Sequence, residues 1–234
     1  MYKKFFTLSF DDGLEMDKRI IERMRHYGLS GTFNINAGLF GYSPRFVKIN
    51  RLPKHEIRGV YEGFEVASHG YKHEMFRYMT RKKIEESLSR DIDELSELMG
   101  YHIAGHAYPY DMHTKSAENY LRSRGILYSR RALGKGSFRF PEDPLKYTAT
   151  CWFNSKKVFR LINEFVNAKP ENGNMLFMMW GHSYELEYGY PKCSPERLEQ
   201  IFSKIAGHND IVYCTSKEAF EGNKAKESKE SLIT

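Results

Sequence analysis

Near its amino end the chain reads Phe5-Phe6-Thr7-Leu8-Ser9-Phe10-Asp11-Asp12-Gly13. The first six of these residues are mostly apolar or β-prone, which predicts a strand that ends at Asp-Asp-Gly. Apolar residues between Met16 and Tyr27 then recur at helical spacing, and Gly28 is typical of a helix C-terminus. A strand followed at once by a helix indicates an α/β protein.

The same alternation continues along the rest of the chain. Further strands are predicted at 31–36, 64–67, 102–107, 125–128, 175–180 and 211–213, and helices at 80–99, 116–124, 158–166 and 194–205. The order predicts right-handed βαβ units around a parallel sheet, either open and doubly wound or closed into a barrel. In both architectures the functional side chains lie just beyond the carboxyl ends of the strands.

Length predicts one or two globular domains, and composition sets residues 221–234 apart from them as a charged tail. Of the 234 residues 41% are hydrophobic and 28% charged, and the tail is rich in Lys, Glu and Ser, which predicts disorder there. No run approaches the roughly 20 apolar residues that span a bilayer, so no membrane partner is expected. The amino end becomes acidic too soon for a signal peptide, which predicts a cytoplasmic protein.

Charge and cysteine usage exclude two further classes. The net charge is +6, but the basic runs are short and scattered, which indicates a solvated surface and no nucleic-acid partner. These runs are Lys3-Lys4, Arg81-Lys82-Lys83 and Arg130-Arg131. The three cysteines, at 151, 193 and 214, lie far apart, so neither a disulfide framework nor a cysteine zinc site is expected.

Polar residues cluster after four of the predicted strands, where a parallel sheet would bring them to one rim. They are Asp11-Asp12, the pair His69 and His73, Tyr110-Asp111, and His182. Two adjacent carboxylates repel each other unless a cation or a shared proton intervenes. Neighbours on an extended chain also point in opposite directions, so one aspartate can ligate a metal while the other faces substrate. Asp-Asp-Gly is equally typical of an ordinary turn.

His69 and His73 are spaced to put two imidazoles on one side of a helical turn or a compact loop. Zinc binds two imidazoles and a carboxylate while keeping a fourth position open for water. A pair of surface or hydrogen-bonding histidines is the alternative in a chain with nine, and we read His102, His106 and His113 in that way. The pair is not a His-Glu-x-x-His motif, because Arg77 occupies the place of the second histidine.

Two motifs are more specific as a pair. Thr7-Leu8-Ser9-Phe10-Asp11-Asp12-Gly13 and Ser68-His69-Gly70-Tyr71-Lys72-His73 resemble the first two motifs of the polysaccharide deacetylase family, which shares the NodB homology domain of the family 4 carbohydrate esterases. The resemblance continues at Tyr108-Pro109-Tyr110, less closely at Trp152, and at Gly181-His182. The matches follow the family's order over roughly residues 5–215, so the resemblance implies a single NodB-like domain over residues 1–220.

The resemblance implies a distorted (β/α) barrel of seven or eight strands and a divalent metal, usually zinc. It implies that the substrate partner is an acetylated carbohydrate, most often N-acetylated, from which the acetyl group is hydrolysed. By this resemblance Asp12, His69 and His73 would hold the metal, Asp11 would be the general base and His182 the general acid. Tyr110 sits where the family uses a backbone N–H beside the oxyanion. Aromatic residues next to the motifs would line a sugar cleft by stacking, or serve packing alone: Tyr71, Tyr110, Trp152 and Tyr184.

Two departures from the family pattern keep other functions open. Ala107 stands where the family's third motif places an arginine that orients the base, and Cys151 stands where an aspartate before Trp152 tunes the histidine. Glu185 or Glu187 could replace that aspartate. The alternatives are hydrolysis of another linear or cyclic amide, as in allantoinase-like relatives, or a catalytically impaired barrel that binds glycans. The sequence makes no prediction about oligomeric state.

Overall fold

The centre of the fold is strand β1 (Lys4–Asp11), in which all eight residues are buried. The structure is a computed structural model that describes residues 2–44, 49–186 and 194–230, with backbone alone for 226–230. β1 pairs in parallel with β8 (Met175–Gly181), β2 (Gly31–Ile35) and β9 (Ile211–Tyr213). A strand with partners along both edges and no exposed residue explains the nearly continuous apolar run in its sequence.

All pairings between the named strands of the described residues are parallel, and two isolated bridges, Leu14–Arg51 and Arg139–Met175, are antiparallel. The sheet runs in the order β6-β5-β4-β3-β2-β1-β8-β7, and β9 pairs with β1 beside this path. The remaining strands are β3 (Glu65–Ser68), β4 (Gly105–Ala107), β5 (Tyr128–Arg131), β6 (Tyr147–Thr148) and β7 (Cys151–Trp152). Arg130 of β5 touches Asp11 of β1 although three strands lie between them, so the sheet curls. The predicted distorted barrel is confirmed, and the open doubly wound sheet is excluded.

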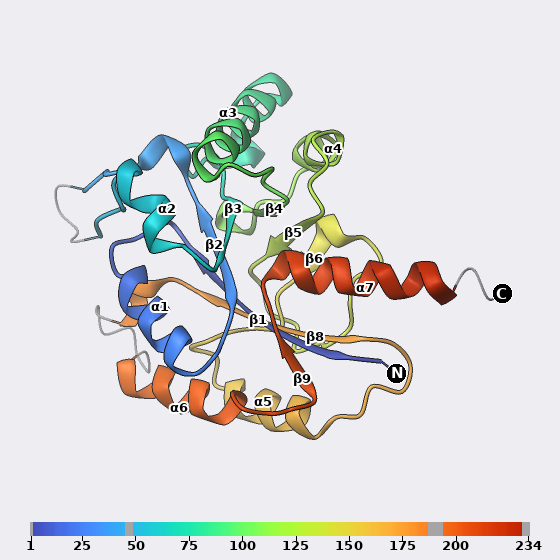
Figure 1. The fold of residues 1–234 in the computed structure, drawn as a ribbon. Coiled ribbons are helices and arrows are strands. Elements are labelled where there is room, and N and C mark those ends of the chain that lie inside the picture. Colours follow the sequence, from blue (N-terminus) through green and yellow to red (C-terminus); the bar gives the residue numbers. More distant parts are fainter. Residues whose placement is uncertain (1, 45–48, 187–193, 231–234) are drawn as a thin grey trace.

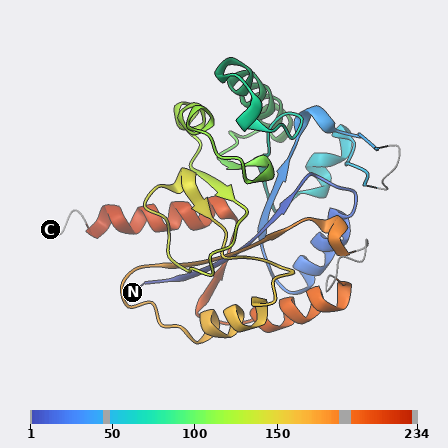
Figure 2. The same cartoon turned by 180° about the vertical axis from the view of Figure 1, so that it is seen from behind.

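Helices surround the curled sheet (Figure 1). In two views from opposite sides, α3 and α4 lie at one end of the molecule and α5 and α6 at the other (Figure 2). The helices are α1 (Asp17–His26), α2 (Ile57–Val60), α3 (Arg81–Met99), α4 (Lys115–Ser123), α5 (Val158–Asn167), α6 (Pro195–Ile205) and α7 (Ser216–Glu230). The predicted signals of α3 are present, because the Thr80 hydroxyl accepts the Lys83 N–H and Gly100 ends the helix in the left-handed region.

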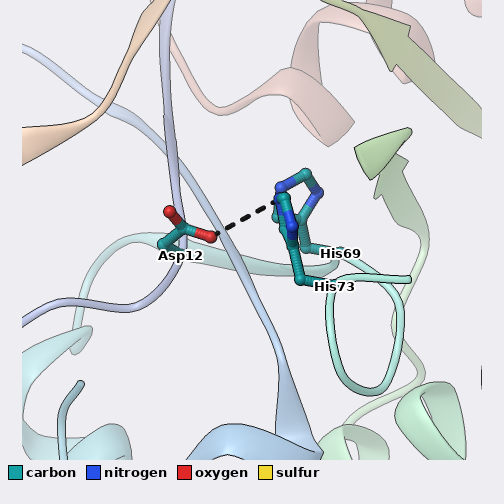
Figure 3. A group of neighbouring side chains, drawn as sticks. All are labelled: Asp12, His69 and His73. Carbon is teal, nitrogen blue, oxygen red and sulfur yellow. Dashed lines mark ion pairs between the residues drawn. The ribbon is translucent and has the colours of Figure 1, made fainter. Parts of the chain in front are cut away.

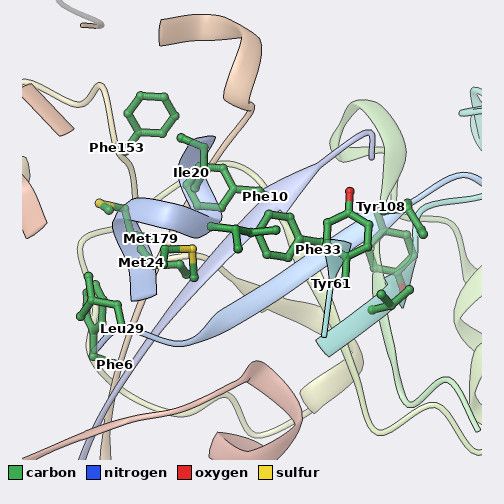
Figure 4. Close-up of a cluster of buried hydrophobic side chains, with 14 of the residues drawn as sticks. Phe6, Phe10, Ile20, Met24, Leu29, Phe33, Tyr61, Tyr108, Phe153 and Met179 are labelled. Atoms are coloured by element: carbon green, nitrogen blue, oxygen red, sulfur yellow. The ribbon is translucent and has the colours of Figure 1, made fainter. Parts of the chain in front are cut away.

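The two faces of β1 have different chemistry because successive side chains point to opposite sides of a strand. Phe6, Leu8 and Phe10 belong to the large apolar core, which also contains Ile20 and Met24 of α1 (Figure 4). The alternate residues, Phe5, Thr7, Ser9 and Asp11, therefore face the barrel interior. Asp11 reaches the interior at the carboxyl end of the strand, so the alternation decides which of the two adjacent aspartates is enclosed.

A buried polar cluster joins α7 to the amino ends of the strands. Glu65 accepts hydrogen bonds from the Thr32 hydroxyl at 2.7 Å, the Tyr128 hydroxyl at 3.0 Å and the Lys217 N–H at 2.9 Å. The Tyr128 ring also stacks on Phe220 of α7, with 5.0 Å between centroids. Burial raises the pKa of Glu65 to about 7, more than these hydrogen bonds lower it. The cluster closes the barrel at the end opposite the predicted site.

This cluster predicts a pH-dependent stability difference for Glu65→Gln. A folded pKa of about 7 above the ordinary 4.5 means that the contribution of Glu65 is complete below pH 4.5 and is lost as pH rises through 7. The free energy of unfolding of the wild type, minus that of the variant, should therefore fall with pH across this window, by at most about 1.4 kcal/mol per unit. Urea unfolding of both proteins at pH 5, 6, 7 and 8 measures the slope, and a constant difference would contradict the prediction.

Several sequence expectations need correction. α7 continues to Glu230, so 221–230 are helical where disorder was expected, whereas 231–234 lie outside the described residues. The basic runs are not all solvated, since Lys4 and Arg130 are both 1% exposed. β5 begins at Tyr128, where the predicted strand ends, and the short strands β6 and β7 are not predicted.

Other expectations concern cysteines and the membrane. Cys151 and Cys214 are buried free thiols, and Cys193 lies outside the described residues. Among the helices that the structure describes, none combines the length and apolar character needed to cross a bilayer. The division into one domain and a tail stays a prediction.

Candidate functional site

The first component of the site is Asp12, at the turn that follows β1. Its φ of 83° lies in the left-handed region, which is uncommon for a residue other than glycine. The Asp12 N–H still donates to the Asn34 carbonyl at 2.9 Å, so the turn stays attached to β2. The Asp12 side chain is 12% exposed and lies 3.4 Å from the Arg51 guanidinium. The turn thus directs Asp12 to the rim while Asp11 stays inside.

His69 and His73 come from the loop after β3 and point toward Asp12 (Figure 3). Their ring centroids are 4.7 Å apart, and His73 Nε2 lies 3.7 Å from Asp12 Oδ1. His73 has a φ of 55°, a second left-handed residue in the site. One ligand atom from each of the three residues lies within 4.8 Å of the other two, and this is the one such group in the described part of the chain. The structure brings together all three predicted metal ligands.

The donor set fits a divalent metal. His69 Nδ1 donates to the Ala107 carbonyl at 2.8 Å, which fixes the tautomer and leaves a lone pair on Nε2. Burial lowers the pKa of His69, and burial together with the neighbouring His69 lowers the pKa of His73 to about 4. Both rings are therefore neutral near pH 7, as metal ligands must be. Two imidazoles and one carboxylate are a set that zinc accepts with an open position.

Asp11 lies inside the barrel against a buried arginine. Arg130 Nη2 lies 2.5 Å from both carboxylate oxygens, and Asn34 Nδ2 donates to Oδ1 at 2.8 Å. Burial alone would raise the pKa of Asp11, but the charges of Arg130, His69 and His182 outweigh it and lower the pKa to about 2. Asp11 is therefore a carboxylate at every pH at which a hydrolase ordinarily works.

His182 follows β8 and is held by Glu185. His182 Nδ1 lies 2.6 Å from Glu185 Oε1, and Trp152 Nε1 donates to Glu185 Oε2 at 2.6 Å. Burial opposes protonation, but the hydrogen bond to Glu185 and the charges of Asp11 and Asp12 outweigh it, so the pKa of His182 is raised. Of the two glutamates suggested by the sequence, Glu185 makes this contact, and Glu187 lies outside the described residues.

The four aromatic candidates have different surroundings. Tyr110, 53% exposed with a φ of 53°, packs its ring 4.4 Å from that of His73. The Tyr184 ring lies 5.0 Å from His182, and Trp152 contacts Glu185. Tyr71 instead lies beneath the Arg90 guanidinium of α3, at 3.9 Å. Three of the four thus lie beside the predicted chemistry, and their contact with substrate stays a prediction.

The arginine beside Asp11 is the main residue that sequence reasoning misses. Ala107 and Arg130 are direct neighbours on the paired strands β4 and β5, so the arginine lies one strand away from the expected position. His106, next to Ala107, is buried and contacts the Ser68 hydroxyl at 3.1 Å, as a hydrogen-bonding histidine. The usable signal was Arg130 itself, two residues beyond the predicted strand end. Extending that strand would have given Arg130 an inward-facing position.

Comparison with known proteins connects this geometry to a family. The sequence profile described as "Polysaccharide deacetylase" matches residues 1–129, more than half of the chain. No curated protein matches.

Three solved structures are similar in fold at low sequence identity. One is a Mycobacterium smegmatis protein assigned as a polysaccharide deacetylase, with 17% identity, coverage of 97% of this chain and 92% of that chain, and a TM-score of 0.65. Another is a family 4 acetyl xylan esterase from Clostridium thermocellum in complex with a cobalt ion, with 17% identity, 93% and 90% coverage, and a TM-score of 0.58. The third is a pseudoenzyme of the same esterase family from Bacillus anthracis, with 14% identity, 93% and 66% coverage, and a TM-score of 0.58.

Proposed function

Because this chain belongs to the polysaccharide deacetylase family, we propose that it is a metal-dependent hydrolase that removes acetyl groups, N-acetyl groups above all, from a sugar or polysaccharide. The observation that carries the proposal is the convergence of Asp12, His69 and His73 within 4.8 Å, beside a buried carboxylate and a glutamate-bound histidine. Binding, base and acid groups thus meet on one rim, as hydrolysis of an amide requires.

Asp12, His69 and His73 would hold a divalent ion, for which we propose zinc. Such an ion supplies polarisation of the acetyl carbonyl and lowers the pKa of a nearby water towards about 7. His69 contributes Nε2, because its Nδ1 is occupied by the Ala107 carbonyl. The related esterase structure is in complex with a cobalt ion, which supports a divalent metal in a protein of this fold.

Asp11 and His182 would move the two protons of the reaction. Asp11 takes one proton from the water as its oxygen bonds to the acetyl carbon. The carbon–nitrogen bond then breaks, and His182 gives a proton to the departing amine, which is a poor leaving group until protonated. The products are acetate and the free amino sugar. The backbone N–H of Tyr110 would donate to the oxyanion, a contact typically worth about 3 kcal/mol.

Glu185 should set the pH range in which His182 is protonated. In Glu185→Gln the negative charge is lost and one of the two donors, His182 or Trp152, loses its acceptor, so the pKa of His182 falls. The alkaline limb of the kcat–pH profile should move to lower pH by about one unit, the low end of a neighbouring charge's effect. The profile is measured with zinc held constant between pH 5 and 9. An unmoved limb would show that His182 is not the acid, or that Glu185 does not tune it.

The direct test is acetate release from chitin oligomers. The purified protein with zinc should release acetate, lose this activity after treatment with a chelator, and recover it when zinc is added back. A second arm offers an O-acetylated xylan and a cyclic amide such as allantoin. Turnover of the cyclic amide alone would show that the protein is an allantoinase-like amidase and not a carbohydrate deacetylase. Metal binding with no turnover of any substrate would favour an impaired, glycan-binding barrel, and the related pseudoenzyme shows that a barrel of this fold can lack activity.

A further inference from the structure

Two adjacent aspartates at the end of β1 have opposite surroundings. The Asp11 carboxylate is buried and contacted by a guanidinium that is itself 1% exposed. The Asp12 carboxylate is partly exposed, and its two nearest polar neighbours are farther away, the Arg51 guanidinium at 3.4 Å and the neutral His73 ring at 3.7 Å. Their backbone positions differ by one residue, so the difference comes from the partners that the rest of the barrel supplies.

We infer that Arg130 is a positioning residue that holds Asp11 away from the metal and presents a single oxygen, Oδ2, as the proton acceptor. The role of Asp11 as proton acceptor rests on the proposed function. The restraint of its carboxylate by Arg130 can be tested without turnover. On this inference, Arg130 of β5 is the reason that Asp11 serves as the proton acceptor while Asp12 serves as a metal ligand.

The hydrogen bonds select Oδ2. Each carboxylate oxygen offers about two lone-pair directions. Oδ1 accepts hydrogen bonds from both Arg130 and Asn34, so both of its lone pairs are occupied. Oδ2 accepts from Arg130 and lies 3.9 Å from His69 Nε2. The remaining lone pair of Oδ2 is therefore next to the proposed metal ligands, where the attacking water would be.

The same closeness makes a restraint necessary. A carboxylate oxygen 3.9 Å from a metal-binding nitrogen needs only a small rotation to become a fourth ligand. Zinc accepts carboxylate oxygens readily, and such a ligand would fill the position that a hydrolytic site keeps open. The Arg130 guanidinium opposes this rotation because one of its nitrogens, Nη2, lies between the two oxygens at 2.5 Å from each, so turning Oδ2 toward the metal would break a charged contact.

Arg130 is well fixed for this task. It sits on β5 directly beside Ala107, and its guanidinium lies 5.2 Å from the Trp180 ring centroid. Its side chain crosses the barrel to β1, which is separated from β5 by three strands of the sheet. A buried ion pair is weak evidence of a purely stabilising role, because desolvation of the two charges offsets much of their attraction.

The first experiment reads the metal site without turnover. The visible spectrum of bound Co²⁺ changes with coordination number, so Arg130→Gln should alter the spectrum as Asp11 becomes a ligand, and should raise Co²⁺ affinity because a fourth side-chain ligand is added. The matched control is Lys4→Gln. Lys4 is an equally buried cation at the other end of the same strand, bonded to the Val166 carbonyl at 2.7 Å and to Asp210. The Co²⁺ spectrum of Lys4→Gln should equal that of the wild type.

The second experiment is a double-mutant cycle with Asp11→Asn. Arg130→Gln should lower kcat on chitin oligomers about 10²-fold with KM nearly unchanged, and Arg130→Lys, which keeps the charge but lacks the rigid plane of the guanidinium, should recover about tenfold. In the Asp11→Asn background Arg130→Gln should have no further effect, because Arg130 acts through Asp11. If Arg130→Gln folds poorly, Arg130→Lys, which keeps the buried charge, takes its place in the cycle.

The outcomes separate the inference from the proposed function. An unchanged Co²⁺ spectrum in both Arg130→Gln and Arg130→Lys would overturn the inference, and so would an equal loss of kcat in the presence and absence of the Asp11 carboxylate. A wild type without acetate release would overturn the proposed function alone, since the spectrum still reports whether Arg130 restrains Asp11.

Discussion

Replacing His73 by alanine is expected to abolish productive metal binding and to lower acetate release from chitin oligomers by at least about 10³-fold. His73 supplies one of only three side-chain ligands in the candidate site. Loss of an outer-shell partner alone usually weakens a metal site about 10–100-fold, so loss of a ligand should exceed that. The metal contributes several kcal/mol of transition-state stabilisation, and about 4 kcal/mol corresponds to 10³ in rate.

The fold should survive this change. The His73 side chain is 18% exposed and lies in a loop, so its removal leaves no closed cavity in the core. Zinc affinity is measured by competition with a chromophoric chelator, and the unfolding midpoint without metal serves as the check on folding. His113→Ala is the control, because that imidazole contacts Glu118 at 3.0 Å instead of Asp12. Unchanged zinc affinity in His73→Ala would remove the residue from the site and with it the proposed Asp-His-His centre.

The parts of the site that sequence predicts are those carried by short, contiguous motifs. Asp12 follows a strand directly, and His69 and His73 share one loop, so the rule for carboxyl ends of parallel strands brings them together. The strands were recognisable for the same reason, since burial on both faces gives apolar runs such as 175–180. Local signals also identified the ends of α3, where capping depends on residues within one turn.

What sequence does not reveal depends on contacts between distant residues. Arg130 and Asp11 are 119 positions apart, and their pairing needs the curvature of the whole sheet. An Arg-Arg pair is also most often a surface feature, so the sequence predicts an exposed Arg130, whereas the side chain is buried. Glu185 was easier to suggest, because it follows His182 by three residues, but its choice over Glu187 required the geometry of the turn after β8. The buried acid Glu65 gave no signal, because the residues that bind it come from three separate elements, β2, β5 and α7.

Replacing Asp11 by asparagine is expected to lower kcat about 10³-fold while zinc affinity stays within about threefold of the wild type. General base catalysis contributes about 10²–10⁴, and an amide cannot take the proton that the carboxylate takes. Zinc affinity is retained because the three ligand side chains are untouched. This separation of rate from binding distinguishes Asp11 from Asp12, its neighbour in sequence.

The Asp11→Asn variant must be assayed with its stability in view. Asparagine leaves the Arg130 charge buried with a weaker partner, and breaking a buried ion pair commonly costs about 3–5 kcal/mol. Single-turnover rates are therefore compared at a temperature where both proteins remain folded, with Asp11→Asn/Arg130→Gln as the charge-balanced control. The double variant should regain stability, because the unpaired buried charge is gone. If Asp11 is the base, the double variant should still be as slow as Asp11→Asn. A kcat within about tenfold of the wild type in either variant would place the proton acceptor elsewhere, because a general base contributes more than that.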